Sequence, residues 1–478
     1  MSQTFTLPLW AIVLIGALAL LSLIHHFLLP SVRWILRRRV NRVIDEVNQR
    51  LALQIPSFKL TRREVLIDRL VYHPDVIEAV ALEAKEQQVP REVLMARVRT
   101  YAREIVPAFN AFLYFKCGYW VARRIVHLLY RVRLGFANDA SLGDLSPTDS
   151  VVFLMNHRSN MDYILATYLA AEKTTLSYAV GEWARVWPLQ QLIRLMGGFF
   201  VRRDSSNPLY RRVLQSYVQM AAEGGVPQAV FPEGRLSRDG HLAPPKLGLL
   251  GYLTKGFDPA GDRDIVFVPV GINYDRVLED RTLVQSSSRK LPEKRGFFTL
   301  WHALRYVYKN LWLALRGRRY RNGYACVNFG EPVSLRNWLA NHQYLSDPLA
   351  TQPLTPEDPP PIETVTQALA DDLMERVGEI IPVLPVALVA TLFTQNPGVE
   401  LTAIDIKTQV DTLIRSLEAK GHKVYIPRNN LDYAVTVGIR MLTMRYLLLD
   451  REGVFSANAD ETALLHYYAA SIAHLVAE

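Results

Sequence analysis

The stretch that decides the fold is Val151–Ile164, which reads VVFLMNHRSNMDYI. Its apolar run ends at Asn156 and is typical of a buried strand, whereas the serine, asparagine and aspartate that follow are residue types that begin helices. We therefore predict a strand-to-helix turn. In such a turn His157 and Asp162 can face each other, with the carboxylate orienting a histidine base. A purely structural pair is the alternative, because this spacing also arises by chance.

Strand-like and helix-like segments alternate after this turn. We expect strands at 176–180, 198–202, 228–231 and 265–270, with a helix at 208–223 and another after Lys246. This alternation predicts an α/β fold, a mixed sheet with flanking helices, whose ligand site lies off the strand ends.

The rest of the chain suggests further parts, because 478 residues exceed one ordinary core. Residues 33–135 show apolar spacing typical of a helical N-terminal domain, and 363–478 a helical C-terminal region. Between them, 136–345 carries the predicted turn. The proline-rich run within 346–362 predicts a linker.

The run from Leu7 to Leu29 contains no Asp, Glu, Lys or Arg. As a helix it would measure roughly 35 Å, enough for the hydrocarbon layer, so we predict a membrane-spanning helix over 7–29. A cleaved signal peptide is the alternative; the arginine cluster that begins at Arg33, after the apolar run, favours an anchor. The positive-inside rule then places everything after Arg33 in the cytoplasm.

The composition points to a polyanionic partner without identifying it. The formal net charge is +9 and the isoelectric point about 9.4, which suits nucleic acid, an acidic membrane surface, a phosphate substrate or an acidic carrier protein. Cys117 and Cys326 lie far apart in the sequence, so neither a disulfide framework nor a thiol metal site is indicated. No histidine has a metal-ligand companion at helical spacing, and we predict no metal site.

Three further stretches stand at predicted strand ends: GGFFVRR (197–203), FPEGRLSRDG (231–240) and VPVGINYDRV (268–277). Arg202 and Arg203 could bind phosphate through their guanidinium groups, or could equally pair with a carboxylate. In the second stretch Glu233 and Gly234 form a turn, and further donors for an anion follow it: Arg235, Ser237, Arg238 and Lys246. A solvated polar loop is the alternative interpretation of this stretch.

Together, the four stretches resemble the phospholipid and glycerol acyltransferase superfamily, and most closely its membrane-bound glycerol-3-phosphate acyltransferases. The resemblance covers about Ala108 to Leu345, and more loosely the C-terminal YYAASIAHL. It implies that His157 is the general base, that Asp162 orients it, and that no acyl-enzyme forms.

The resemblance also implies substrate-binding residues in the other three motifs. Phe200 and Arg203 fall on the second motif, whose arginine is linked to glycerol 3-phosphate, and Pro269 falls on the fourth, linked to the acyl-chain side. Glu233, Gly234 and Ser237 match the third motif. There the family usually has an arginine where this chain has Leu236, which puts the phosphate contact, and with it the acceptor, in question; Arg235 or Lys246 could substitute.

The resemblance implies an enzyme that transfers a fatty acyl group from acyl-CoA or acyl carrier protein to position 1 of glycerol 3-phosphate, giving lysophosphatidate, with no cofactor. Alternatives are 1-acylglycerol 3-phosphate or dihydroxyacetone phosphate as acceptor, or a non-catalytic lipid-binding protein of the same fold. We expect membrane phospholipid as a partner and no nucleic acid. The expected location is the cell inner membrane, with the catalytic domain on the cytoplasmic side.

Overall fold

Strand β2 (Ser150–Met155) lies inside the main sheet, and every one of its residues is buried. Its sequence, SVVFLM, is apolar on both faces, as expected for a strand covered on both sides. It pairs in parallel with β5 (Gln228–Val230) and β6 (Ile265–Tyr274). The carboxyl ends of these three strands therefore meet at one edge of the sheet.

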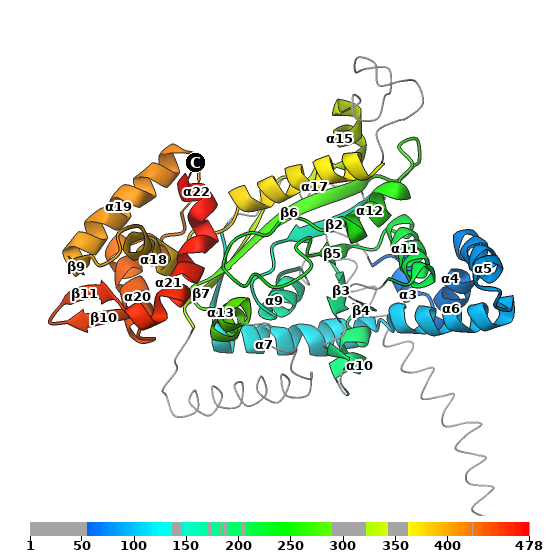
Figure 1. Ribbon diagram of the computed structural model, residues 1–478, viewed down its shortest axis with the longest axis horizontal. Helices are drawn as coiled ribbons and strands as arrows, with labels where there is room; N and C mark the ends of the chain where they lie inside the picture. Colours follow the sequence, from blue (N-terminus) through cyan, green and yellow to red (C-terminus); the bar gives the residue numbers. More distant parts are fainter. Residues whose placement is uncertain are drawn as a thin grey trace, which may run out of the picture. The chain divides into compact units, whose positions relative to one another are not determined.

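The computed structural model describes residues 55–135, 146, 148–170, 174–181, 184, 185, 187, 189–202, 206–288, 322–342, 362–422 and 424–477. Residues 55–478 group into one compact unit. Figure 1 shows the elements of this unit in sequence colours.

Within the described residues the main sheet has eight strands, in the order β1-β7-β6-β2-β5-β3-β4, with β8 beside β6. The pairing of β6 with β7 and β8 is antiparallel and the remaining pairings are parallel, so the sheet is mixed as predicted. The other strands of this sheet are β1 (Arg131–Leu134), β3 (Ser177–Gly181), β4 (Phe199–Val201), β7 (Tyr324–Phe329) and β8 (Val333–Ser334).

Helices pack on both faces of the sheet (Figure 1). On one face, Val152 and Leu154 of β2 share a core cluster with Val213 of α11 and Leu373 of α17. On the other face α9 begins directly after the turn that follows β2, and α7 packs beside it. The helices around the sheet are α7 (Tyr119–Leu129), α9 (Met161–Ala170), α10 (Leu189–Leu195), α11 (Pro208–Glu223), α12 (Gly248–Lys255), α13 (Asp280–Ser288), α15 (Leu335–Asn341) and α17 (Ile362–Glu379).

In the described residues, the regions before and after the sheet are mainly helical. The first contains α3 (Ser57–Leu60), α4 (Arg63–Val71), α5 (Pro74–Gln87), α6 (Arg91–Ile105) and a π-helical turn, η2 (Leu113–Gly118). The last contains α18 (Pro385–Gln395), α19 (Ala403–Ala419), α20 (Leu431–Thr443), α21 (Thr462–Ala469), α22 (Ala473–Ala477) and the short 3-10 turns η4 (Pro427–Asn429), η5 (Ala459–Glu461) and η6 (Ala470–Ile472).

One strand of the main sheet and a separate small sheet lie where helix was expected. Arg131–Leu134 forms β1 because it pairs in parallel with β7, a partner far along the chain that local periodicity does not reveal. The C-terminal region also holds a small antiparallel sheet of β9 (Glu400–Thr402), β10 (Leu448–Arg451) and β11 (Val454–Ala457). The predicted domain boundaries themselves stay predictions, and the linker 346–362 lies outside the described residues except for its last position.

The predicted fold class needs one correction. No helix in the described part of the chain combines the length and the apolar character needed to cross a membrane; the longest, α17, has 18 residues and carries acidic residues along its length. The run from 7 to 29, for which a membrane-spanning helix was predicted, lies outside the described residues. The fold class is therefore corrected to a mixed α/β sheet with flanking helices, and the described residues do not support a membrane-spanning helix.

Candidate active site

His157 and Asp162 meet in the turn between β2 and α9. The imidazole Nδ1 lies 2.9 Å from Asp162 Oδ2, and both side chains are buried. Because an ionised carboxylate only accepts hydrogen bonds, this contact places the proton on Nδ1 and leaves the lone pair on Nε2. Nε2 has no hydrogen-bond partner among the described residues. The pair thus has the arrangement of an oriented general base.

Asp162 is held by more than the histidine. Its Oδ2 also accepts hydrogen bonds from the backbone N–H groups of Arg158 and Ser159, at 2.7 and 2.9 Å. Its Oδ1 accepts a 2.6 Å hydrogen bond from the phenol of Tyr274 at the end of β6. Four donors therefore surround a fully buried carboxylate and fix its position.

The third motif holds the backbone of His157 from both sides. Glu233 Oε1 accepts a 2.7 Å hydrogen bond from the His157 N–H, while the Ser237 N–H donates to the His157 carbonyl at 2.9 Å. Glu233 Oε2 accepts from the Ala243 N–H at 3.0 Å. Burial raises the pKa of Glu233 to about 7. These contacts support a positioning role for Glu233 and Ser237 rather than direct contact with a substrate.

Aromatic rings flank the imidazole. The ring of Phe231 lies 4.2 Å from it, centroid to centroid, and that of Tyr163 lies 5.3 Å away at a steep angle. They exclude water from the sides of the base and restrict its rotation.

The exposed cations of the third motif lie on the loop that holds His157. Arg235, Arg238 and Lys246 are exposed, and within the described residues no carboxylate pairs with them. Gly234 has φ +68°, and a Cβ there would lie 2.9 Å from Lys246 Cδ, so glycine suits this turn. Leu236 is half-buried. The loop can therefore present these three cations to an anion.

The second motif is only partly described. Arg202 forms a two-pronged ion pair with Glu104 of α6, with distances of 2.9 and 2.8 Å, so its fork is already occupied. Phe200 is fully buried, with the guanidinium groups of Arg185 and Arg194 each 5.7 Å from its ring. Arg203 lies outside the described residues.

Residues that the sequence did not identify complete the turn. Glu279 accepts hydrogen bonds from Ser159 Oγ at 2.8 Å and from the Asn160 amide at 3.1 Å, and burial raises its pKa. Asn156 exchanges two hydrogen bonds with the backbone of Ile272, at 2.9 and 2.7 Å, and so attaches the turn to β6. Tyr274 lies inside the fourth motif and is the last residue of β6. The alternation of strands and helices in the sequence could have identified it, because it predicts that the end of this strand lies at the same edge of the sheet as the turn.

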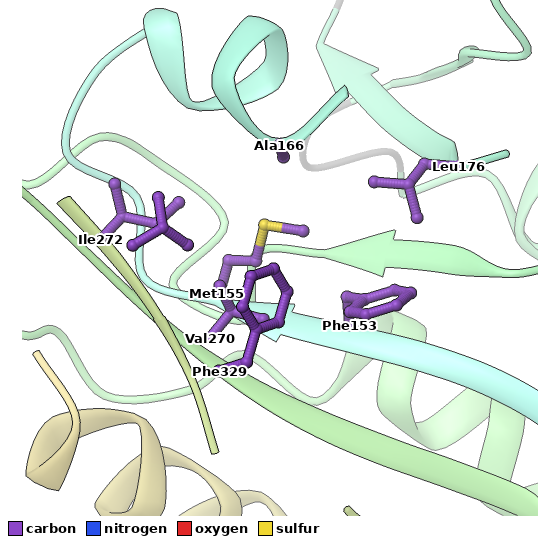
Figure 2. A pocket seen from close by; sticks show the side chains of 8 residues that line it. Phe153, Met155, Ala166, Leu176, Val270, Ile272 and Phe329 are labelled. Atoms are coloured by element: carbon purple, nitrogen blue, oxygen red, sulfur yellow. The ribbon is translucent and has the colours of Figure 1, made fainter. Parts of the chain in front are cut away.

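Pro269, the residue predicted from the fourth motif, is buried within β6 opposite Leu154 and does not reach the turn. Farther along β6, an apolar pocket lies on the face of the sheet that packs on α9. Figure 2 shows Met155 pointing toward Ala166 across it. The pocket is lined by Phe153, Met155, Ala166, Leu176, Val270, Ile272, Val327 and Phe329. Its free space is about 10 Å³, so a bound chain would require these side chains to move.

No group of three His, Cys, Asp or Glu side chains in the described ranges is arranged to hold a metal ion.

Comparison with known proteins shows that this chain is similar to acyltransferases. Residues 141–273 match the family described as Acyltransferase, and residues 310–478 match the glycerol-3-phosphate acyltransferase C-terminal region. A glycerol-3-phosphate acyltransferase of Xanthomonas axonopodis pv. citri is 25% identical over 451 residues, 92% of this chain and 48% of that protein. One of Aeromonas hydrophila subsp. hydrophila is 28% identical over 437 residues, 90% of this chain and 52% of that protein.

The chain thus spans about half the length of the curated relatives it matches. The crystal structure of a 1-acyl-sn-glycerophosphate acyltransferase from Thermotoga maritima covers 66% of this chain and 98% of its own, at 16% identity and a TM-score of 0.29, too low to support an argument. The two family matches and the curated relatives confirm the resemblance predicted from the four motifs.

Proposed function

We propose that this chain, a member of the glycerol-3-phosphate acyltransferases by its two matched regions, transfers a fatty acyl group from a thioester to the 1-hydroxyl of glycerol 3-phosphate. The products are lysophosphatidate and the free thiol of the donor. The observation that carries the proposal is the buried His157–Asp162 pair, whose Nε2 has no hydrogen-bond partner in the described part of the chain.

His157 Nε2 takes the proton of the acceptor hydroxyl as its oxygen attacks the thioester carbonyl carbon. Asp162 stabilises the imidazolium that forms, because its carboxylate accepts the Nδ1 proton throughout. When the tetrahedral intermediate collapses, the carbon–sulfur bond breaks and the imidazolium returns the proton to the thiolate. The acyl group passes directly to the acceptor, and the histidine is regenerated.

The acceptor's phosphate needs cationic partners, since a desolvated dianion without them is costly. Arg235, Arg238 and Lys246 are suitable because they are exposed, lie on the loop that holds His157 and have no carboxylate partner among the described residues. Arg203 is a further candidate through the second motif. Arg202 is a poor one, because Glu104 occupies its guanidinium.

For the acyl chain we favour the apolar face beneath the turn. Phe153 and Met155 are the last residues of β2 on that face, directly ahead of His157, and the pocket they line exposes no polar surface. Met155 is unbranched and adaptable, which suits a pocket that opens when a chain enters. The donor is acyl-CoA or acyl carrier protein, both acidic partners for a chain of net charge +9.

The acceptor is tested directly with purified protein, acyl-CoA and labelled acceptors supplied separately. We expect glycerol 3-phosphate to give the highest kcat/KM, above 1-acylglycerol 3-phosphate and dihydroxyacetone phosphate. A preference for 1-acylglycerol 3-phosphate would replace the proposed acceptor, and no acyl transfer to any of the three would favour the non-catalytic lipid-binding alternative. Replacing acyl-CoA by acyl carrier protein in the same assay identifies the donor.

Location at the cell inner membrane, with the site on its cytoplasmic side, stays a prediction. Fractionation of cells followed by detection of the chain in membrane and soluble fractions checks it.

A further inference from the structure

A second cavity lies at the edge of the sheet opposite His157. Its volume is about 250 Å³. Ser177, which begins β3, and Val226, which precedes β5, contribute to its wall, whereas His157 follows the carboxyl end of β2. Because β2, β5 and β3 run in parallel, these two positions are at opposite ends of the strands. The cavity is lined by Phe58, Lys59, Leu60, Thr61, Arg62, Arg63, Leu66, Pro107, Ala108, Phe109, Ser177, Tyr217 and Val226.

Lys59 supplies a buried amine to this cavity. The residue is buried, with a relative exposure of 7%. Its Nζ donates to the Thr175 carbonyl at 3.0 Å and lies 4.6 Å from the centroid of the Phe109 ring. No carboxylate among the described residues pairs with it, and burial lowers the pKa of Lys59 well below its usual value. A lysine buried in this way normally has an anionic partner, because desolvating an unpaired ammonium is costly.

Two arginines add positive charge beside it. Arg62 is exposed and has no ion-pair partner in the described part of the chain. Arg63 donates to the Val106 carbonyl at 3.0 Å, and its nearest acidic group, on Glu64, is 3.8 Å away. The cavity therefore has a cationic side with little acidic compensation.

The remaining wall is apolar. Phe58, Leu66 and Val226 contribute side chains without polar atoms, and the rings of Phe109 and Tyr217 extend the same surface. A volume of about 250 Å³ exceeds that of engineered apolar cavities that accept a benzene ring. An alkyl group with an anionic head would satisfy both sides of this cavity.

We infer that the cavity binds a medium-chain alkyl anion, a carboxylate or a phosphate monoester, with its head on Lys59 and its chain along the apolar wall. This site is separate from the His157 turn and does not depend on the proposed acyl transfer.

The test is isothermal titration calorimetry on the full chain with octyl phosphate, octanoate and inorganic phosphate. We expect binding of one or both alkyl anions, and weaker binding of inorganic phosphate, which lacks the chain. Lys59→Met should weaken binding of the alkyl anion about tenfold or more, since a hydrogen bond to a charged group is lost. Lys407→Met, at a half-buried lysine of α19 that pairs with Asp432, should leave it unchanged.

Two outcomes overturn the inference: no binding of either alkyl anion to the unaltered chain, or equal binding to the Lys59→Met variant. Inorganic phosphate that binds as tightly as octyl phosphate would overturn the role of the apolar wall. Thermal unfolding of Lys59→Met checks that the variant folds. The midpoint temperature should stay equal or rise, because methionine replaces a buried amine that has no carboxylate partner among the described residues.

A pH series gives a second readout. The titratable and charged groups around the amine are Arg62 before α4, Arg63 at the start of α4, Tyr114 of η2 and Tyr217 of α11. Burial raises the pKa of both tyrosines, so they stay neutral over the tested range. Affinity should therefore fall as pH rises through the lowered pKa of Lys59, and a pH-independent affinity would contradict a head group bound by that amine.

Discussion

The phenol of Tyr274 donates a 2.6 Å hydrogen bond to Asp162, the carboxylate that orients His157. The two residues are 112 positions apart in the chain and meet because β6 pairs in parallel with β2. Tyr274 is fully buried, and the charge of Asp162 helps raise its pKa well above the usual value, so the phenol remains a donor at any working pH. Tyr274 is therefore a positioning residue for the proposed base.

Tyr274→Phe removes that donor without changing the shape of the site. We expect kcat to fall about 10- to 100-fold, because a buried hydrogen bond to a charged group contributes roughly 1.5–3 kcal/mol, while KM for both substrates changes little. Tyr130→Phe is the matched control: its ring packs against that of Tyr274, but its hydroxyl donates to the Arg276 carbonyl. Equal loss of kcat in both variants would contradict the role given to Tyr274.

Glu233→Gln should change the pH dependence of stability. Burial raises the pKa of Glu233 to about 7, above its value in an unfolded chain, so the folded protein binds this proton more tightly. Its stabilising contribution is full below the unfolded pKa and is lost as pH rises through about 7. The variant lacks this titration, so its free energy of unfolding should fall less between pH 5 and 8, by roughly 3 kcal/mol.

Chemical denaturation at the two pH values measures this difference. Glu223→Gln, at an exposed position on α11, is the control and should keep the pH dependence of the unaltered chain. Asp275 and Glu279 also have pKa values raised by burial; they remain in both variants and cancel in the comparison. An unchanged pH dependence in Glu233→Gln would show that this carboxyl is not buried in solution.

Gly240→Ala should disturb the third-motif loop. A Cβ at this position would lie 2.0 Å from the Tyr467 carbonyl oxygen, and φ is +95°. We expect a loss of stability above the roughly 1–2 kcal/mol of left-handed strain, together with reduced activity, since Ser237 of the same loop holds His157. Gly421→Ala has a similar φ of +89° with open space around it, so it isolates the strain. Thermal unfolding and activity of the two variants should differ; equal effects would rule out the clash.

A buried ion pair attaches the C-terminal region to the start of α13. Arg445 Nη2 lies 2.5 Å from Asp280 Oδ2, and Tyr468 donates to the same carboxylate. Arg445→Met should destabilise the chain by about 3–5 kcal/mol, because Asp280 keeps a buried, unpaired charge. In the double variant Arg445→Met, Asp280→Asn much of this loss should be recovered. Denaturation of the four proteins in this cycle measures the coupling, and simple additivity would contradict the pairing.

The sequence predicted the five strands from β2 to β6, because these are short apolar runs with turn residues at both ends, but it did not predict β1, β7 and β8. The α11 prediction, 208–223, coincides with the observed helix, and the His157–Asp162 contact followed from a local turn. Contacts between residues far apart in the chain could not be predicted from the local sequence. Glu104 lies 98 positions before Arg202, so nothing near the second motif revealed that this arginine was already paired.

The third motif shows the same limit. Its residue types suggested phosphate binding, and local sequence could not distinguish residues that face solvent from residues that turn inward. In the structure Glu233 and Ser237 turn inward to the backbone of His157, whereas Arg235 and Arg238 stay exposed. The contact depends on β5 lying beside β2, which is a property of the whole sheet.

The most direct measurement is the rate of lysophosphatidate formation from glycerol 3-phosphate and acyl-CoA by the unaltered chain, by His157→Ala and by His241→Ala. His241 is exposed on the third-motif loop and serves as the matched control. Loss of the general base should lower kcat by about 10²- to 10⁴-fold in His157→Ala, and His241→Ala should keep the original rate. Equal product from the unaltered chain and His157→Ala would contradict acyl transfer by this histidine.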